Sequence, residues 1–234
     1  YLFRTVGTVG HPSNQALSAT TGTFSDNVTL TGTTPTLTIG DAGAEDTKIV
    51  FDGNAQDFHI GLDDSADSLT MGLGSTLGTT SHMVFDSNGH ILKPLQPAFM
   101  AKLSSEQGNL TNDSAHNTLA FATEIFDQNA DYNNSNYTFT APVTGRYQLS
   151  FAIYLQQIDT GSNFIYVALR TSNRDVFFII DPNFSADLDY YYSAGSLLSD
   201  MDANDTATVS FVQSGGTAQV DANAHSYFSG FLAC

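Results

Sequence analysis

The sequence predicts an all-β protein, on three observations. Thr, Ser, Asn, Asp and Gly are abundant, while long stretches rich in Glu, Lys, Leu and Ala are missing, which favours strands and turns over helices. The segment from Tyr147 to Leu155 is apolar at every odd position, the period of a half-buried strand. Short strand-like motifs also recur between residues 34 and 92. Because 41% of the 234 residues are hydrophobic, the chain can bury a core.

Charge excludes several classes of partner. Seven Lys and Arg residues stand against 24 Asp and Glu residues, so the formal net charge is −17 at pH 7. Such a chain repels nucleic-acid phosphates and anionic lipid, and we expect neither as a partner. The longest apolar runs, Phe164 to Leu169 and Val176 to Ile180, are far shorter than the roughly 18 residues of a membrane span. We therefore expect no membrane insertion.

The single cysteine, Cys234, is the last residue, so no intrachain disulfide can form. The fold must be held by packing and association. Because the chain begins at Tyr1 with neither Met nor a signal-peptide pattern, we expect it to be a piece of a longer protein.

The N-terminal part divides into two compositions. Residues 1–33 are rich in Gly, Thr and Ser, which predicts an extended lead-in. Residues 34–93 hold an imperfect repeat: Thr36–Gly40 recurs as Ser68–Gly72, and Ile49–Asp52 recurs as Met83–Asp86. Units this short cannot bury a face unless they stack or wrap around other chains, so the repeat predicts a fibrous β shaft. An ordinary β-meander is the alternative.

Residues 94–234 are predicted to form a separate head. Pro94 and Pro97 mark the hinge before it, because proline fixes its own φ and restricts the preceding residue. Besides Tyr147 to Leu155, four segments have strand composition and are bounded by turn residues: 164–170, 176–180, 196–201 and 206–212. Five or more strands at short spacing indicate a β-sandwich, and with Greek-key connections a jelly roll.

A constellation of residues in the head carries a family resemblance. The stretch from Tyr137 to Tyr147 reads YTFTAPVTGRY, and the signature residues are Phe121, Asp127, Tyr132, Phe139, Gly145, Tyr147, Phe151, Phe228, Gly230 and Phe231. Their order and spacing resemble the globular head of complement component one-q, a jelly-roll family related to tumour necrosis factor. Leu149 departs from the family, which usually has Phe there. The resemblance implies a ten-stranded jelly-roll sandwich over residues 97–234 that forms a homotrimer, with the aromatic residues filling its core.

The repeats resemble a different class of protein. Segments such as Val50 to Phe58 and Ile60 to Asp67 are similar to repeats in tail-fibre and other virion fibre proteins of marine bacteriophages. Together with the head, this implies an exposed phage fibre: a trimeric β shaft joined to other virion proteins at its N-terminal end, and a head that attaches to a host cell-surface protein or glycan. The alternatives are a capsid-attached or purely structural fibre, and a secreted recognition module of the same head family.

Candidate recognition residues lie in loops, because loops on a rigid scaffold carry recognition. The expected loops are 104–116, 156–163, 181–193 and 213–224. The run Tyr190, Tyr191 and Tyr192 is a candidate receptor-binding patch, although a strand at a subunit interface would have the same composition.

Metal and catalytic patterns are weak. Six histidines are scattered without ligand spacing, so a zinc site is not expected, although His59 or His82 could form a ring where three chains meet. Calcium is the one cofactor considered, in the acidic loops 63–67 and 200–205. Asp200 matches an acidic position in calcium-binding heads, but Tyr191 stands at the companion position. The chain has no nucleophile elbow, P-loop or dinucleotide motif, so no enzyme activity is predicted.

Overall fold

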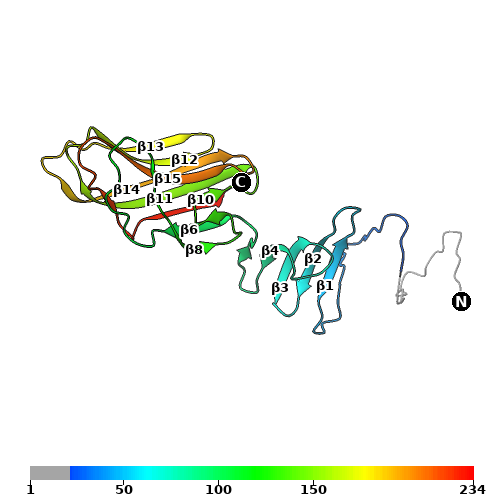
Figure 1. Ribbon diagram of the computed structural model, residues 1–234. Helices are drawn as coiled ribbons and strands as arrows, with labels where there is room; N and C mark the ends of the chain where they lie inside the picture. Colours follow the sequence, from blue (N-terminus) through cyan, green and yellow to red (C-terminus); the bar gives the residue numbers. More distant parts are fainter. Residues whose placement is uncertain (1–21) are drawn as a thin grey trace, which may run out of the picture. The chain divides into compact units, whose positions relative to one another are not determined.

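The computed structural model describes residues 22–234, and these form strands, turns and loops without a helix (Figure 1). The predicted all-β class is confirmed. None of the described residues forms a helix that could cross a membrane. The chain divides into two units, residues 1–41 and 42–234. The described part of the first unit, residues 22–41, contains no strand; the rest of the predicted lead-in lies outside the described residues.

The first sheet of the second unit is an antiparallel meander of five strands in sequence order. Its turns are closed by carboxylates: Asp86 accepts backbone N–H groups of Asn88 and His90 at 2.9 and 2.8 Å. The strands are β1 (Thr47–Phe51), β2 (Phe58–Asp63), β3 (Ser68–Leu73), β4 (Ser81–Phe85) and β5 (Ile91–Leu92).

Only the second copy of the first repeat motif forms a strand. Ser68–Gly72 lies in β3, but Thr36–Gly40 is exposed and unpaired within the sheets of the described residues, so the prediction of a strand there is wrong. A strand needs a neighbour for its backbone N–H and C=O groups, and no described segment supplies one. Within one chain the region is the simple meander given as the alternative; stacking into a shaft stays a prediction.

The head is a sandwich of two antiparallel sheets. One has the order β13-β12-β15-β10-β9, with β7 beside β15, and the other has the order β14-β11-β17-β6-β8, with β16 beside β11. We call them the outer and inner sheets. The strands are β6 (Ala98–Lys102), β7 (Asn117–Thr118), β8 (Thr123–Asp127), β9 (Tyr132–Asn133), β10 (Thr138–Thr140), β11 (Gly145–Ile158), β12 (Phe164–Thr171), β13 (Asp175–Ile180), β14 (Leu188–Met201), β15 (Thr206–Ser214), β16 (Asp221–Ala222) and β17 (Tyr227–Leu232).

The jelly-roll architecture agrees with the prediction, with two differences. Twelve strands are described where ten were predicted, because β7 and β16, of two residues each, pair beside the main path of each sheet. The predicted loop 181–193 is too long: β14 begins at Leu188 and pairs residue by residue with β11, Tyr191 opposite Leu155 and Tyr192 opposite Tyr154. The tyrosine run favours a strand because aromatic side chains pack well on a pleated surface.

Aromatic rings fill the space between the two sheets, as expected. Of the signature residues, Phe121, Tyr132, Phe139, Tyr147, Phe151 and Phe228 are buried. Leu149, the departure from the family pattern, is fully buried as well. Phe231 differs, with 49% of its surface exposed, because Phe228 and Gly230 take the inward positions of β17 and the alternation turns Phe231 outward.

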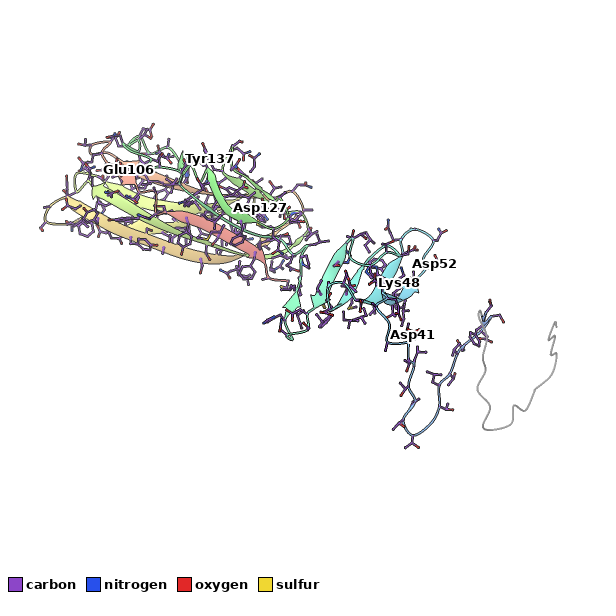
Figure 2. All side chains as sticks on the ribbon, turned by 90° about the horizontal axis from the view of Figure 1, so that it is seen from below. Asp41, Lys48, Asp52, Glu106, Asp127 and Tyr137 are labelled. Carbon is purple, nitrogen blue, oxygen red and sulfur yellow. The ribbon has the colours of Figure 1, made fainter. Side chains whose placement is uncertain are left out.

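The polar groups of the signature residues stabilise the ends of strands. Asp127, at the end of β8, accepts backbone N–H groups of Asp131 and Tyr132 at 3.2 and 2.9 Å (Figure 2). The Tyr132 hydroxyl donates to the carbonyl of Phe121 at 2.9 Å, and burial raises the pKa of this phenol. The Tyr147 hydroxyl donates to the carbonyl of Val143 at 2.7 Å. These residues maintain the fold.

Gly230 occupies a position where any side chain would collide with the core. A Cβ there would lie 2.7 Å from Leu149 Cδ2 and 2.9 Å from Phe99 Cε1. We predict that Gly230→Ala lowers the free energy of unfolding by about 1–3 kcal/mol, the usual cost of overpacking. Ser229→Ala, one residue away on the outward face, should change it by less than about 0.5 kcal/mol. Urea titrations of both variants test this; equal effects would contradict it.

Candidate functional site

Four loops gather at one end of the jelly roll, and they correspond to the four segments predicted from the sequence to carry recognition, with the third shortened from 181–193 to 181–187. The direction of the strands explains the arrangement: β11 starts at Gly145, where the Arg146 N–H donates to the Cys234 carbonyl, and ends at Ile158 at the far end of the sandwich. Pro97 also lies beside the C-terminal strand, its carbonyl accepting the Leu232 N–H. We call the opposite end, formed by residues 104–116, 156–163, 181–187 and 213–224, the loop end (Figure 1).

Two buried carboxylates tie three of these loops together. Asp221 accepts the backbone N–H of Asn109 at 2.7 Å and the side-chain amide of Gln157 at 2.8 Å. Asp159 accepts the N–H groups of Gly161 and Thr217. Only 8% and 6% of the surfaces of Asp221 and Asp159 are exposed, so both carboxylates act inside the structure. A charged acceptor makes stronger hydrogen bonds than a neutral one, which fixes the loops relative to one another.

A third carboxylate connects the remaining loop. Asp187 accepts the backbone N–H and hydroxyl of Thr160 at 3.0 and 2.7 Å, and its second oxygen accepts the Gln219 side-chain amide at 2.9 Å. The hydrogen bonds from Thr160, and then that from Gln219, hold the pKa of this exposed carboxyl below its usual 3.8. The loop end is therefore a single hydrogen-bonded surface rather than four independent loops.

The candidate tyrosines face two directions. Tyr190 and Tyr192 lie on the solvent side of the inner sheet, with 63% and 57% of their surfaces exposed, next to Tyr154. The ring centroids of Tyr154 and Tyr190 are 5.8 Å apart, and a hollow of about 410 Å³ lies among the tyrosines. Tyr191 points to the other side and packs with Phe184 against the core. In a single chain, therefore, only Tyr190 and Tyr192 present an exposed side chain to a binding partner.

Further exposed apolar residues continue the tyrosine face. Phe231 and Leu198 stand on either side of Gln148 across three neighbouring strands, and 49% and 56% of their surfaces are exposed. Sequence reasoning did not single out Leu198 as a surface residue. The signal was present: β14 carries apolar residues at both odd and even positions, which indicates that both faces of the strand are to be covered.

A separate apolar patch lies on the outer sheet. Phe164, Tyr166, Phe177 and Ile179 line a shallow hollow of about 260 Å³. Ile179 is the most exposed of them, at 75%. Both segments were predicted as strands, but no surface patch was predicted on them; their apolar residues at consecutive positions were the available signal for this patch.

The predicted calcium residues do not come together within one chain. The Asp200 carboxylate pairs with the Arg174 guanidinium at 2.6 Å, and Tyr191, at the companion position, lies toward the other end of β14. Among residues 22–234, no cluster of three or more His, Cys, Asp or Glu side chains is arranged to hold a metal ion. Calcium binding at Asp200 stays a prediction.

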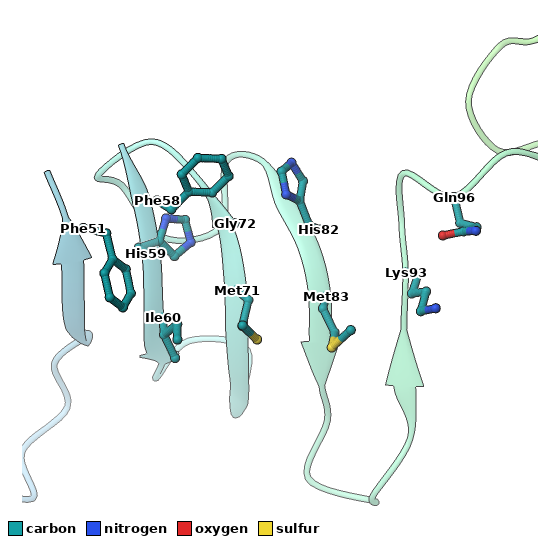
Figure 3. A pocket seen from close by; sticks show the side chains of 10 residues that line it. All are labelled: Phe51, Phe58, His59, Ile60, Met71, Gly72, His82, Met83, Lys93 and Gln96. Carbon is teal, nitrogen blue, oxygen red and sulfur yellow. The ribbon is translucent and has the colours of Figure 1, made fainter. Parts of the chain in front are cut away.

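The two candidate histidines of the five-stranded sheet have different environments. His59 is buried; its Nδ1 hydrogen-bonds to the Gly74 carbonyl at 2.8 Å, and its buried Nε2 has no partner in the described residues. The ring lies over Gly72, where a Cβ would come within 2.9 Å of Nε2. His82 is exposed beside Phe58 (Figure 3). A ring of three copies of either histidine stays a prediction.

The family follows from a comparison with known domains. A family model described as the C1q domain matches residues 98–233, which is more than half of the chain. The chain belongs to the C1q domain family. Among solved structures, the globular domain of zebrafish complement 1qA protein is similar, with 16% identity over 59% of this chain and 98% of that chain, at a TM-score of 0.43. Murine APRIL at pH 8.0 is similar with 10% identity over 58% and 98% of the two chains, at a TM-score of 0.42. Among curated proteins, none matches.

C1q domains are recognition or structural modules, and the C1q domain of this chain is one of these two kinds of module. Recognition through its loop end stays a prediction; a rigid sandwich that holds the loops in a fixed arrangement is consistent with it.

We predict that Asp187→Asn loosens the loop end. In the variant, one of the two carboxylate oxygens becomes an NH₂ group, which donates and cannot accept. The hydrogen bonds from Thr160 and from the Gln219 side-chain amide therefore cannot all form. Amide hydrogen exchange at Thr160 should become faster. Asp189→Asn, an exposed position with the same change of charge, should leave it unaltered. Equal exchange in both variants would contradict the role given to Asp187.

Acidification of the unsubstituted chain should act in the same direction. Because the pKa of Asp187 is lowered in the folded protein, its stabilising contribution is complete above pH 3.8 and is lost as the pH falls through the lowered pKa. The protection of the Thr160 amide, measured as its exchange rate relative to that of an unstructured peptide at the same pH, is therefore expected to fall only below about pH 3.8.

Proposed function

We propose that this protein is a homotrimeric bacteriophage virion fibre whose C1q domain attaches the particle to a host surface molecule. The observation that carries the proposal is the loop end: four loops joined by hydrogen bonds at the end of the head opposite to the linker at Pro97. The resemblance of residues 34–93 to phage fibre repeats supports the virion assignment, with the N-terminal part joined to other virion proteins. In this position the head is extracellular and exposed.

The uncovered face of the inner sheet supports the trimer. Between Tyr190 and Leu198 the outward positions of β14 carry tyrosines, Ala, Ser and Leu, and no carboxylate or basic group. β14 is also an edge of its sheet, with backbone groups open to a neighbour. C1q-type domains form homotrimers, and an uncharged apolar face beside an open edge suits that association.

We predict that Leu198→Asp breaks the trimer, because it places a charge from each chain in an apolar contact without a partner. Light scattering should give about three times 25.0 kDa for the unsubstituted chain and a single-chain mass for the variant. Ile179→Asp, an equally apolar and exposed position on the outer sheet, should leave the mass unchanged. A single-chain mass before substitution would overturn the trimer. Repeating the measurement with a chelator tests calcium at Asp200.

Three loop ends on one particle suit attachment through weak individual contacts. Because the three sites are held in one body, binding at one raises the effective concentration of the others, and avidity exceeds single-site affinity. The carboxylates of Asp159 and Asp221 are turned inward, whereas those of Glu106, Asp113 and Asp181 are exposed, so the surface offers carboxylates, loop backbone, amides and hydroxyls to its partner. Such groups recognise either a glycan or a polar protein surface.

Competition for host cells tests attachment. The purified chain should bind intact bacterial host cells and slow the adsorption of virions, because both use the same surface molecule. Ala186→Trp, in the loop end, should abolish competition, and Ala203→Trp, in the exposed turn between β14 and β15, should preserve it. Chain that is present in virions but does not compete would favour the capsid-attached or purely structural fibre.

A secreted recognition module of the same family is the second candidate. It is favoured by one observation: the family match covers residues 98–233 and does not extend over the repeats. Genomic neighbours without virion genes, together with absence of the chain from purified virions, would select this candidate.

A further inference from the structure

The five-stranded sheet has an inverted distribution of side chains. In β3, Ser68, Thr70 and Gly72 are buried, whereas Leu69 and Met71 are exposed. In β2, His59 and Gly61 are buried between exposed or half-buried apolar neighbours. A half-exposed sheet normally does the reverse, with its apolar face covered and its polar face in water.

The chain itself covers the small and polar face. Leu77, in the loop between β3 and β4, is buried, and it would contact any side chain at Gly61. Two hydrogen bonds fix this loop: Lys48 Nζ donates to the Ser75 carbonyl at 2.6 Å, and His59 bonds to the Gly74 carbonyl. The other face of the sheet receives no such cover from the described residues.

The strand register assembles the uncovered face from apolar residues. Ile49 pairs with Ile60, Ile60 with Met71, and Met71 with Met83, so one row crosses four strands. Figure 3 shows Ile60, Met71 and Met83 along this row. With the flanking rows, the strand positions on this face are Thr47, Ile49, Phe51, Phe58, Ile60, Leu62, Leu69, Met71, Leu73, Met83, Phe85 and Ile91.

This face is hollowed, and its strand positions carry no charged side chain. A hollow of about 540 Å³ opens over it, with Lys93 at its lining as the one charged side chain among the described residues that border it. The acidic residues of the sheet lie in turns or at a strand end: Asp57 before β2, Asp63 as its last residue, Asp64 after it, and Asp86 after β4. An exposed apolar surface of this extent marks an interaction site rather than an ordinary solvent face.

We propose that this face packs against the same face of two other copies of the chain, around a common axis. The inference rests on the trimer proposed above and assigns a second interface to it. Each copy carries a net charge of −17, so copies repel except where their surfaces are uncharged, and this face meets that condition. The sheet is joined to the C1q domain by residues 93–97 alone, so association of the heads holds the three sheets at high effective concentration.

Three copies also complete the burial that one chain lacks. Each sheet would then have one face covered by its own loop at Leu77 and the other by its two neighbours. The apolar row from Ile49 to Met83 would lie in a dry interior, while the turns with their carboxylates stay in water. The five-stranded sheet can thus bury its apolar face without a second sheet supplied by the same chain.

Protection of an introduced thiol tests the interface. In a Cys234→Ser background of the full chain, Met71→Cys places a thiol on the apolar face and Ser75→Cys places one in the exposed loop on the covered side. With a maleimide reagent, the thiol at position 71 should react at least about tenfold more slowly than that at position 75, because reaction requires the interface to open. In denaturant both should react at the same rate.

The mass of each sample, measured in parallel, distinguishes this inference from the proposed function. Three-chain mass with protection at position 71 supports it. Three-chain mass with equal labelling at both positions overturns the interface but leaves the trimeric head. Two-chain mass with protection replaces the threefold arrangement by a face-to-face pair, and single-chain mass with rapid labelling overturns the interface and the trimer together.

Discussion

Stacking around Phe99 is the packing interaction on which the head depends. Its ring centroid lies 5.0 Å from that of Tyr132, 4.8 Å from Phe139 and 5.0 Å from Phe228. Phe99 and Phe228 belong to the inner sheet, and Tyr132 and Phe139 to the outer one, so these contacts join the two layers. Aromatic rings supply large buried areas in few residues, which suits a sandwich without a disulfide between its own strands.

The loop end inherits its rigidity from this core. The buried sandwich fixes the ends of β11, β12, β14 and β15, and the carboxylates of Asp159, Asp187 and Asp221 then join the loops between them. At the loop end the chain is too polar to form a second hydrophobic core, and hydrogen bonds to acidic side chains hold the loops together instead. Many of the other acidic residues are exposed to solvent, whereas these three stabilise the arrangement of the loops.

The positions of most strands and the residues of the core could be predicted from the sequence, because alternation and turn residues determine them. The period-two pattern located β11, strand composition between turn residues located β12, β13, the second half of β14 and β15, and the signature aromatics identified the core. The sequence left Tyr190 to Tyr192 in a predicted loop, so it could not say which of the three face the solvent; once the run is a strand, alternation separates Tyr191 from the other two, and the packing of the sheet decides which face points inward. Nor could it predict that Asp187 meets Thr160 and Gln219, since contacts between loops distant in sequence depend on topology. The strand expected at Thr36–Gly40 failed because composition does not show whether a partner strand exists.

Two uncovered sheet faces remain in a single chain: that of β14, β11 and β17 in the C1q domain and that of β1 to β5 before it. Both lack acidic residues at their centres, although the chain has 24 Asp and Glu residues. Repulsion among three copies, each with a charge of −17, opposes association and is screened by salt, whereas burial of an apolar face is not weakened in this way. Because the two faces lack charged residues at their centres, the repulsion between copies comes from the solvent-exposed turns. Salt screens this repulsion, so assembly should become stronger as the ionic strength rises. An association held by surface ion pairs would respond in the opposite direction.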